Sequence, residues 1–309
     1  RIDLKNKIKD NINTDVLIWD ETIFQGGNYN DPYLKDRRKN YYFNNINANE
    51  AWKTTTGNKD IVIAVIDDGF DLNHPELNNN IIKPYNVLRK NDNVYASKKL
   101  NHGTHVSGLA ISKKNNSKGA CGIAPDCSFM PIQIGSETNP GMFTMNSIID
   151  GVLYAVNNGA DVINLSIQSM YPDEAKRITD QQLNEMIKDM SRDDELFWNE
   201  LFKISNDSNI SIVFAAGNYD VLIGLDAMKR YDNIITVSAV DQKNKRADFS
   251  NYGKRSTISA PGVDIWSCEP GGDFVMMDGT SMAAPIISGV VGLIKSVNPD
   301  LNNSQIKSI

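Results

Sequence analysis

Ile61-Val62-Ile63-Ala64-Val65-Ile66-Asp67-Asp68-Gly69 is the stretch of this 309-residue chain that decides the fold. Its first part is an unbroken apolar run, rich in β-branched residues, which is typical of a strand buried on both faces in a parallel sheet. The run ends in two carboxylates and a glycine, which permits a sharp turn. Functional residues of parallel sheets gather at the carboxyl ends of the strands, so this stretch also marks the start of a site.

Apolar runs of the same kind recur at 129–134, 162–167, 210–215 and 234–240. Segments with helical character lie between them, at 103–113, 144–157 and 181–203. Strands that alternate with helices predict an α/β fold, and right-handed crossovers place helices on both faces of the sheet. We therefore expect a three-layer architecture with a mostly parallel central sheet flanked by helices.

Composition limits the functions that the chain can have. The net charge of −6 argues against nucleic acid as a partner, and 40% hydrophobic residues allow a large core. No uninterrupted apolar run has the ~18 residues that a membrane span needs. The three cysteines, Cys121, Cys127 and Cys268, lack the spacing of a metal site, so we expect buried thiols, with a Cys121–Cys127 bridge as the alternative.

The first 39 residues are polar and irregular, and they indicate an N-terminal extension, a linker or the tail of a pro-segment. Residues 40–309 then form one domain, with a C-terminal helix that the end of the chain could truncate. The strongly charged segment 171–206 carries apolar residues at helical spacing. It predicts one or two solvated surface helices, with a lid or partner surface as the alternative.

A candidate nucleophile lies in Gly279-Thr280-Ser281-Met282-Ala283-Ala284-Pro285, where Ser281 opens an apolar helical run. The N–H groups and dipole of a helix N-terminus favour developing negative charge, although a lone serine there is usually only a cap. A base and an acid are present upstream: His102, in Asn101-His102-Gly103-Thr104-His105, and Asp67. Imidazole is the natural general base near neutral pH. Asn218, at the end of Val213-Phe214-Ala215-Ala216-Gly217-Asn218, could donate to an oxyanion.

Together, the motifs around Asp67, His102, Asn218 and Ser281 resemble those of the subtilisin-like serine proteases, in the order Asp, His, Ser. The resemblance implies a serine endopeptidase. Ser281 would attack the scissile carbonyl, His102 would move the proton, and Asp67 would orient His102. Asn218 and the Ser281 N–H would hold the oxyanion, with the Thr280 hydroxyl as a helper, and His105 would be structural.

The resemblance also implies how a peptide is held. The substrate would lie as an added strand, with Gly141 on one flank and Ser166, Ile167 and Gln168 on the other. Gln168 replaces a glycine usual in the family and would narrow the pocket for the residue before the scissile bond. Asp226, at the floor of that pocket, and Asp68, as in the kexin and furin branch, would favour basic residues. The alternative is that Asp226 is solvated.

By the same resemblance, the chemistry needs no cofactor, and a structural Ca²⁺ would be held by Glu76 and Asn116. Oxygen ligands suit Ca²⁺, but Lys113, Lys114 and Lys118 bring positive charge to that loop. We expect an exported monomer that acts on peptide or protein substrates, with a pro-segment as a further partner. The alternative function is a catalytically silent subtilase fold used for binding or regulation; an α/β-hydrolase ranks last, because its Gly-x-Ser-x-Gly elbow is missing.

Overall fold

The computed structural model describes residues 30–36, 38–119, 121–189 and 192–309. Its centre is a parallel sheet of seven strands in the order β2-β3-β1-β4-β5-β6-β7. A separate antiparallel pair, β8 and β9, lies beside it. The strand bounds are β1 Val62–Asp67, β2 Tyr85–Asn86, β3 Ser128–Gln133, β4 Val162–Leu165, β5 Ser211–Ala215, β6 Ile234–Val240, β7 Ile258–Pro261, β8 Ile265–Glu269 and β9 Asp273–Met277.

The predicted strands are present, with ends that differ from the predicted runs by one or two residues. Every residue of β1, β3, β4 and β5 is buried, which explains why these strands are mostly apolar. The largest difference is at β4, which ends at Leu165 instead of Ile167. Ser166 and Ile167 therefore lie beyond the strand, at the carboxyl-terminal edge of the sheet.

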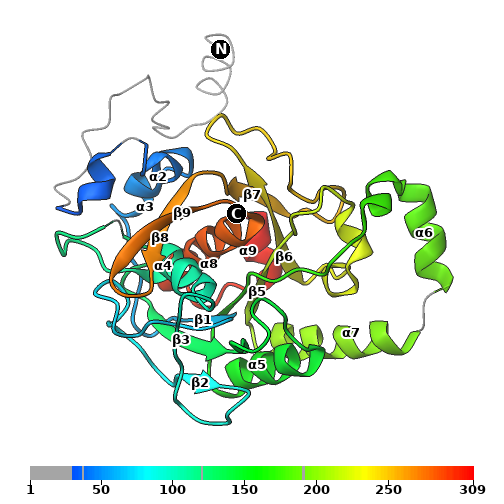
Figure 1. The fold of residues 1–309 in the computed structure, drawn as a ribbon, viewed down its shortest axis with the longest axis horizontal. Helices are drawn as coiled ribbons and strands as arrows, with labels where there is room; N and C mark the ends of the chain where they lie inside the picture. Colours follow the sequence, from blue (N-terminus) through cyan, green and yellow to red (C-terminus); the bar gives the residue numbers. More distant parts are fainter. Residues whose placement is uncertain (1–29, 37, 120, 190–191) are drawn as a thin grey trace.

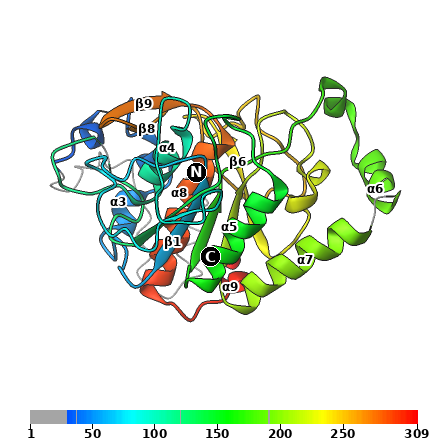
Figure 2. The same ribbon diagram turned by 60° about the horizontal axis from the view of Figure 1, so that its bottom comes forward.

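Helices cover both faces of the sheet, as predicted (Figures 1 and 2). Side chains of α4 (His102–Ile111) and α8 (Thr280–Val297) share one hydrophobic core with one face of the strands. Those of α5 (Met145–Asn157) and α7 (Arg192–Asp207) share a second core with the other face. The remaining helical elements are η1 Pro32–Lys35, α2 Tyr41–Asn45, α3 Ala48–Ala51, η2 Asp173–Arg177, α6 Asp180–Asp189, η3 Ile223–Leu225, η4 Ala227–Lys229 and α9 Asn303–Ser308.

The strand order places the site. From β1 the chain continues to β2 and β3 on one side of the sheet, and from β4 onward it builds the other side. The crossovers therefore diverge between β1 and β4, and such a switch point leaves a crevice at the carboxyl ends of the strands. Asp67 ends β1, and Ser166 follows β4, so they flank this crevice.

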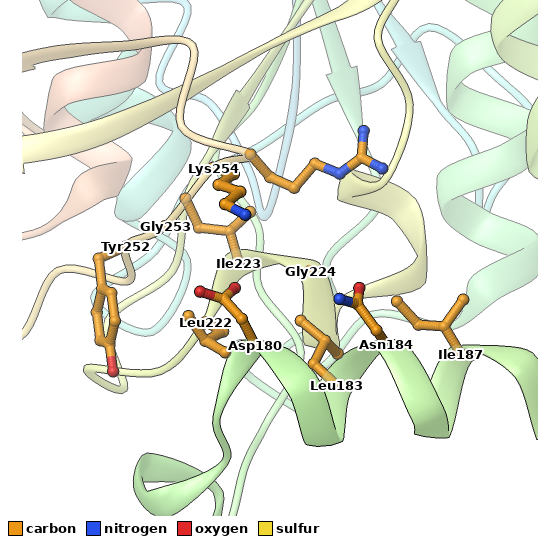
Figure 3. Close-up of a pocket in the computed structure, with 11 residues that line it drawn as sticks. Asp180, Leu183, Asn184, Ile187, Leu222, Ile223, Gly224, Tyr252, Gly253 and Lys254 are labelled. Carbon is orange, nitrogen blue, oxygen red and sulfur yellow. The ribbon is translucent and has the colours of Figure 1, made fainter.

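Segment 171–206 is more than a pair of solvated surface helices. Helix α7 buries Trp198, Leu201 and Phe202 in the second core, whereas α6 is held out to the side of the domain (Figures 1 and 2). Leu183 is the buried residue of α6, and it packs against Gly224. Between α6 and the segments 222–224 and 252–255 is a cavity of about 290 Å³, whose lining side chains Figure 3 shows.

The fold bears on two further expectations and leaves a third one open. All three cysteines are free and buried, so the alternative Cys121–Cys127 bridge is not formed. Helix α8 has the length and hydropathy of a membrane-spanning helix. However, 72% of it is buried inside the domain, as in the core helix of a globular protein. Most of the predicted extension 1–39, namely residues 1–29 and 37, lies outside the described residues.

Candidate active site

Asp67 and His102 come together at the carboxyl end of β1. The fully buried Asp67 accepts a hydrogen bond from Nδ1 of His102 onto Oδ1, at 2.8 Å. The same oxygen accepts the backbone N–H of Asp68, at 2.7 Å. This contact leaves Nε2 of His102 as the ring nitrogen that can accept a proton. The first turn of α4 approaches β1 closely here, since a Cβ on Gly103 would lie 2.9 Å from the Cβ of Asp67.

The charge of Asp67 raises the pKa of His102. Burial lowers the pKa of His102, but the Asp67 charge, its hydrogen bond and the Asp68 charge together outweigh burial and raise the pKa to about 9. The His102 side chain is 30% exposed, so solvent screens part of this effect. The imidazolium form is therefore stabilised, as is needed when the ring takes up a proton.

Ser281 is the second residue of α8, and its position depends on Pro285. A proline inside a helix has no N–H to give to the carbonyl four residues earlier, which here is that of Ser281. The hydroxyl of Ser166 takes over and donates to Ser281 O at 3.0 Å. In return, Oγ of Ser281 donates to Ser166 O at 3.3 Å. The hydroxyl faces the cleft that His102 also lines, and it must turn from Ser166 toward the imidazole to pass on its proton.

The side-chain nitrogen of Asn218 and the backbone nitrogen of Ser281 both lie close to Gly279. Oδ1 of Asn218 accepts hydrogen bonds from both the N–H and the hydroxyl of Thr280, at 2.9 Å each, so Nδ2 of Asn218 is left for the cleft. Gly279 has φ of +153°, and a Cβ built on it would lie 3.3 Å from Asn218 Nδ2 and 3.5 Å from the Ser281 N. Since glycine has no Cβ, the space between the two donors is open. An oxyanion hole needs two N–H donors around an open space of this kind.

Thr280 differs from its predicted role. Its side chain is completely buried, and its hydroxyl accepts from the Gly217 N–H at 2.9 Å while donating to Asn218. The hydroxyl is therefore already used by two protein groups. Thr280 orients Asn218 and does not reach the cleft.

The cleft contains most of the residues predicted from the sequence. It has a volume of about 480 Å³, with Gly141 on one wall and Ser166, Ile167 and Gln168 on the other. Further lining residues are Asp68, Lys99, Asn101, His102, Pro140, Phe143, Asn218, Met277, Asp278, Ser281 and Met282. The sequence did not single out Lys99, Phe143 or the segment 277–278, because their residue types carry no motif.

The two acids predicted to attract basic substrates are both engaged by the protein. Asp68 accepts the N–H groups of His102 and Gly103, at 3.2 and 2.8 Å. It therefore caps the N-terminus of α4, although it lies far from that helix in the sequence. Burial, and then the Asp67 charge, raise its pKa to about 6. Asp226 is desolvated as predicted, but its Oδ2 lies 3.0 Å from Nζ of Lys229, and both side chains are almost fully buried. Asp226 does not line the cleft. Sequence reasoning missed Lys229, for which the only signal was the i,i+3 spacing.

Glu76 and Asn116, the predicted calcium ligands, are in contact: Nδ2 of Asn116 donates to Oε2 of Glu76, at 2.8 Å. Oε1 of Glu76 is buried and has no hydrogen-bond partner. Asp31, which the sequence did not assign to this site, accepts the N–H groups of Asn115 and Asn116 at 2.7 and 2.9 Å. Burial first, and the Asp31 charge further, raise the pKa of Glu76 to about 8.

His105 was expected to be structural, and its surroundings agree. The ring is fully buried, Nε2 lies 3.2 Å from Val275 O, and burial lowers its pKa to about 3. A neutral imidazole that contacts β9 ties α4 to the β8–β9 pair. His102 is therefore the histidine that faces the cleft.

A buried acid bonded to an imidazole, and a helix-terminal hydroxyl in the cleft that this imidazole also lines, are the arrangement typical of the serine hydrolases. The comparisons give the family: residues 58–309 match the model of the subtilase family, and the chain belongs to it. The chain is 34% identical over 286 residues to a thermophilic serine proteinase of Bacillus sp. (strain AK1), a match of 86% of this chain and 64% of the relative. It is 31% identical over 278 residues to thermitase of Thermoactinomyces vulgaris, covering 89% and 88%.

The solved structures agree with the fold. A protease structure described as from Pseudoalteromonas arctica PAMC 21717 superposes with a TM-score of 0.72 at 25% identity, covering 91% of this chain and 90% of that one. The chain spans 64% of the length of the Bacillus sp. relative and 58% of subtilisin NAT from Bacillus subtilis subsp. natto.

Proposed function

We propose that the chain is a serine endopeptidase that hydrolyses peptide bonds through Asp67, His102 and Ser281. The observation that carries this proposal is the convergence of the 2.8 Å Asp67–His102 contact, the Ser281 hydroxyl and the two N–H donors on one cleft. Membership of the subtilase family supports it. A catalytically silent subtilase would need none of these groups to face the same space.

The proposed reaction follows from the contacts. Ser281 Oγ attacks the carbonyl carbon while Nε2 of His102 takes its proton, and Asp67 stabilises the imidazolium. The carbonyl oxygen becomes an oxyanion between Nδ2 of Asn218 and the N–H of Ser281. The imidazolium then gives its proton to the leaving amine. Water, activated by the same imidazole, hydrolyses the acyl-enzyme and regenerates Ser281.

A fluorophosphonate probe tests this proposal directly. We expect stoichiometric labelling of Ser281 in the folded protein, and no labelling in S281A. Ser296, whose Oγ donates to Gly292 O in the same helix, provides the matched control, because S296A removes a hydroxyl of α8 away from the cleft and should still be labelled. A folded protein that is not labelled would favour the silent alternative.

The sequence also predicted a preference for Lys or Arg before the scissile bond, based on Asp226 and Asp68. Two observations count against it. Asp226 is already paired with Lys229, and Asp68 accepts two backbone N–H groups. An acid whose charge is already matched has little left to offer a substrate cation. Cleavage rates of matched Arg, Phe and Glu reporter peptides test the preference.

We also propose that Glu76, Asn116 and Asp31 hold a structural Ca²⁺. The unpartnered Oε1 of Glu76 and the proximity of a second buried carboxylate fit a hard cation. Asn116 would have to turn its amide so that the oxygen, and not Nδ2, faces Glu76. The ion would neutralise the buried acid and fix the loop 113–119. It takes no part in the chemistry.

A further inference from the structure

A buried lysine lies behind the cleft wall, in a place that the triad does not use. The side chain of Lys229 is 1% exposed, and its Nζ lies 3.0 Å from Asp226, 3.4 Å from Ile167 O and 3.5 Å from Ala216 O. Ile167 follows β4, and Ala216 follows β5. The ammonium therefore joins the ends of two neighbouring strands at the base of the gap between them.

The mouth of the same gap is also bridged. Oε1 of Gln168 accepts the backbone N–H of Asn218, at 2.6 Å. The same oxygen lies 3.5 Å from the position that a Cβ on Gly217 would take, so the amide lies over that glycine. Gln168 thus reaches from the β4 side of the gap to the β5 side. The lining of the cleft stops at Ile167, Gln168 and Asn218, and includes neither Asp226 nor Lys229.

The gap matters because of where the substrate must lie. Its carbonyl carbon has to be next to Ser281 Oγ, which is 3.3 Å from Ser166 O, with the carbonyl oxygen between the two N–H donors. The residue that supplies this carbonyl then lies between Ser166–Gln168 and Gly217–Asn218. Its side chain points toward the gap that Gln168 and Lys229 close.

We propose that the Gln168 bridge and the Lys229–Asp226 ion pair close this gap from its two ends, so that the protein cleaves after small uncharged residues such as Ala and Ser. This inference rests on the proposed function and names its substrate class.

Each excluded substrate class has its own physical reason. A Lys or Arg side chain would bring a second cation toward the buried ammonium of Lys229, and the neighbouring Asp226 is already paired. A Glu side chain would lose its hydration on entering the gap. It would gain no partner there, because Lys229 is already paired with Asp226. A Phe side chain would have to displace the Gln168 amide and leave the Asn218 N–H without its partner. A small side chain needs none of these changes.

The test uses tetrapeptide reporters that differ only in the residue before the scissile bond, namely Ala, Phe, Arg and Glu. Active enzyme is first counted by fluorophosphonate labelling. We expect kcat/KM for Ala to exceed that for Phe, Arg and Glu by about tenfold or more, the size of effect that a closed pocket produces. Labelled enzyme that cleaves after Phe or Arg as fast as after Ala would overturn this inference alone. An absence of both labelling and hydrolysis would overturn the proposed function, and this inference with it.

Two single variants test the two ends of the gap separately, Q168G at its mouth and K229M at its base. Q168G should raise kcat/KM for Phe about tenfold relative to Ala, with little change in the Arg-to-Ala ratio, because Lys229 still repels Arg. K229M should raise the Arg-to-Ala ratio, because it frees the Asp226 charge. The double variant D226N/K229M removes both charges and should keep the wild-type Arg-to-Ala ratio, which assigns any rise in K229M to the freed Asp226 charge. If K229M does not fold, the Phe-to-Ala ratio of Q168G decides the test. R255M breaks the exposed Arg255–Asp232 pair and should leave every ratio unchanged. Unchanged ratios in both Q168G and K229M would overturn the inference.

Discussion

Ser166 and Ser281 are joined twice: Oγ of Ser166 donates to Ser281 O at 3.0 Å, and Oγ of Ser281 donates to Ser166 O at 3.3 Å. The first bond exists because Pro285 leaves that carbonyl without a helical donor. Ser166 is supported in turn by Asn164 Nδ2 at 3.0 Å, whose Oδ1 accepts from Ser288. A buried polar chain therefore fixes the start of α8 against β4.

The first prediction concerns this chain. S166A removes the donor to Ser281 O and the acceptor for Asn164, so two buried groups lose their partners. We expect a loss of about 1–3 kcal/mol in the free energy of unfolding, measured by urea denaturation, together with a fall in kcat. S136A, which removes an exposed hydroxyl paired with Thr138, should change neither quantity. If S166A were as stable as the wild type, the buried hydrogen bonds of Ser166 would not contribute to the stability of the protein.

The second prediction tests the oxyanion space. G279A would place a Cβ at 3.3 Å from Nδ2 of Asn218 and 3.5 Å from the Ser281 N, where the oxyanion must sit. We expect kcat to fall on the order of 100-fold or more, with a smaller effect on KM. G159A is the control, because Gly159 also has positive φ, +83°, but nothing lies within 4 Å of its would-be Cβ. It should lose stability only, and an active G279A would contradict the assignment of the two donors.

The pH dependence follows from His102. The general base must be unprotonated, and the Asp67 charge and hydrogen bond, with the Asp68 charge, outweigh burial and raise its pKa from 6.5 to about 9. We therefore expect kcat/KM to rise with pH well beyond 7, with an alkaline optimum. D68N should move the rising limb to lower pH, because it removes one of the charges that raise the pKa. A limb centred at or below 6.5 in the wild type would contradict the electrostatic argument.

Calcium and pH should act together through Glu76. The folded protein holds the pKa of Glu76 at about 8, above the usual 4.5. The folded state therefore binds this proton more tightly than the unfolded state, and without calcium the contribution to stability falls as the pH rises from about 4.5 to 8. We expect Ca²⁺ to raise the melting temperature more at pH 8 than at pH 5.

The variant E76Q checks the same site. It should remove the Ca²⁺ response and, without calcium, melt higher than the wild type at pH 8. E50Q, at an exposed pair with Lys53, is the control and should keep the response. An equal Ca²⁺ response in E76Q would place the ion elsewhere.

The three thiols make a simple prediction. Cys121, Cys127 and Cys268 are free and buried, and burial raises the pKa of each. Because the thiolate is the reactive form, we expect no reaction with a thiol reagent in the folded protein. All three should react after unfolding without a reductant, and a count of one would reveal a disulfide.

Much of the fold could be predicted from the sequence, for physical reasons. Buried parallel strands are largely apolar on both faces, so β1, β3, β4, β5 and β6 were visible as runs rich in apolar residues. The two-residue strand β2 and the hairpin of β8 and β9 were not, because short edge strands and hairpins with an exposed face leave no such run. Thr144 was correctly placed at the start of α5, where its hydroxyl accepts the Ser147 N–H.

Site residues that belong to a sequence motif could be predicted. The roles of residues that depend on buried partners could not. His102 and Ser281 line one cleft and the buried Asp67 lies behind His102 as expected, although their catalytic roles stay predictions until activity is measured. Asp226 could not be judged from sequence, because the partner that neutralises it, Lys229, looks like any loop lysine. Thr280 was misassigned for a similar reason: only the structure shows that its hydroxyl is already taken.

The placement of Ser281 on α8 has a consequence for how the protein is made. This helix lies against β1, β4, β5, β6 and β7, and it is the last long element of the described chain. A partly synthesised polypeptide would thus carry its acid and its imidazole long before it has an alcohol to activate. Under the proposed function, Ser281 would therefore face His102 only after α8 has packed against the strands of the sheet.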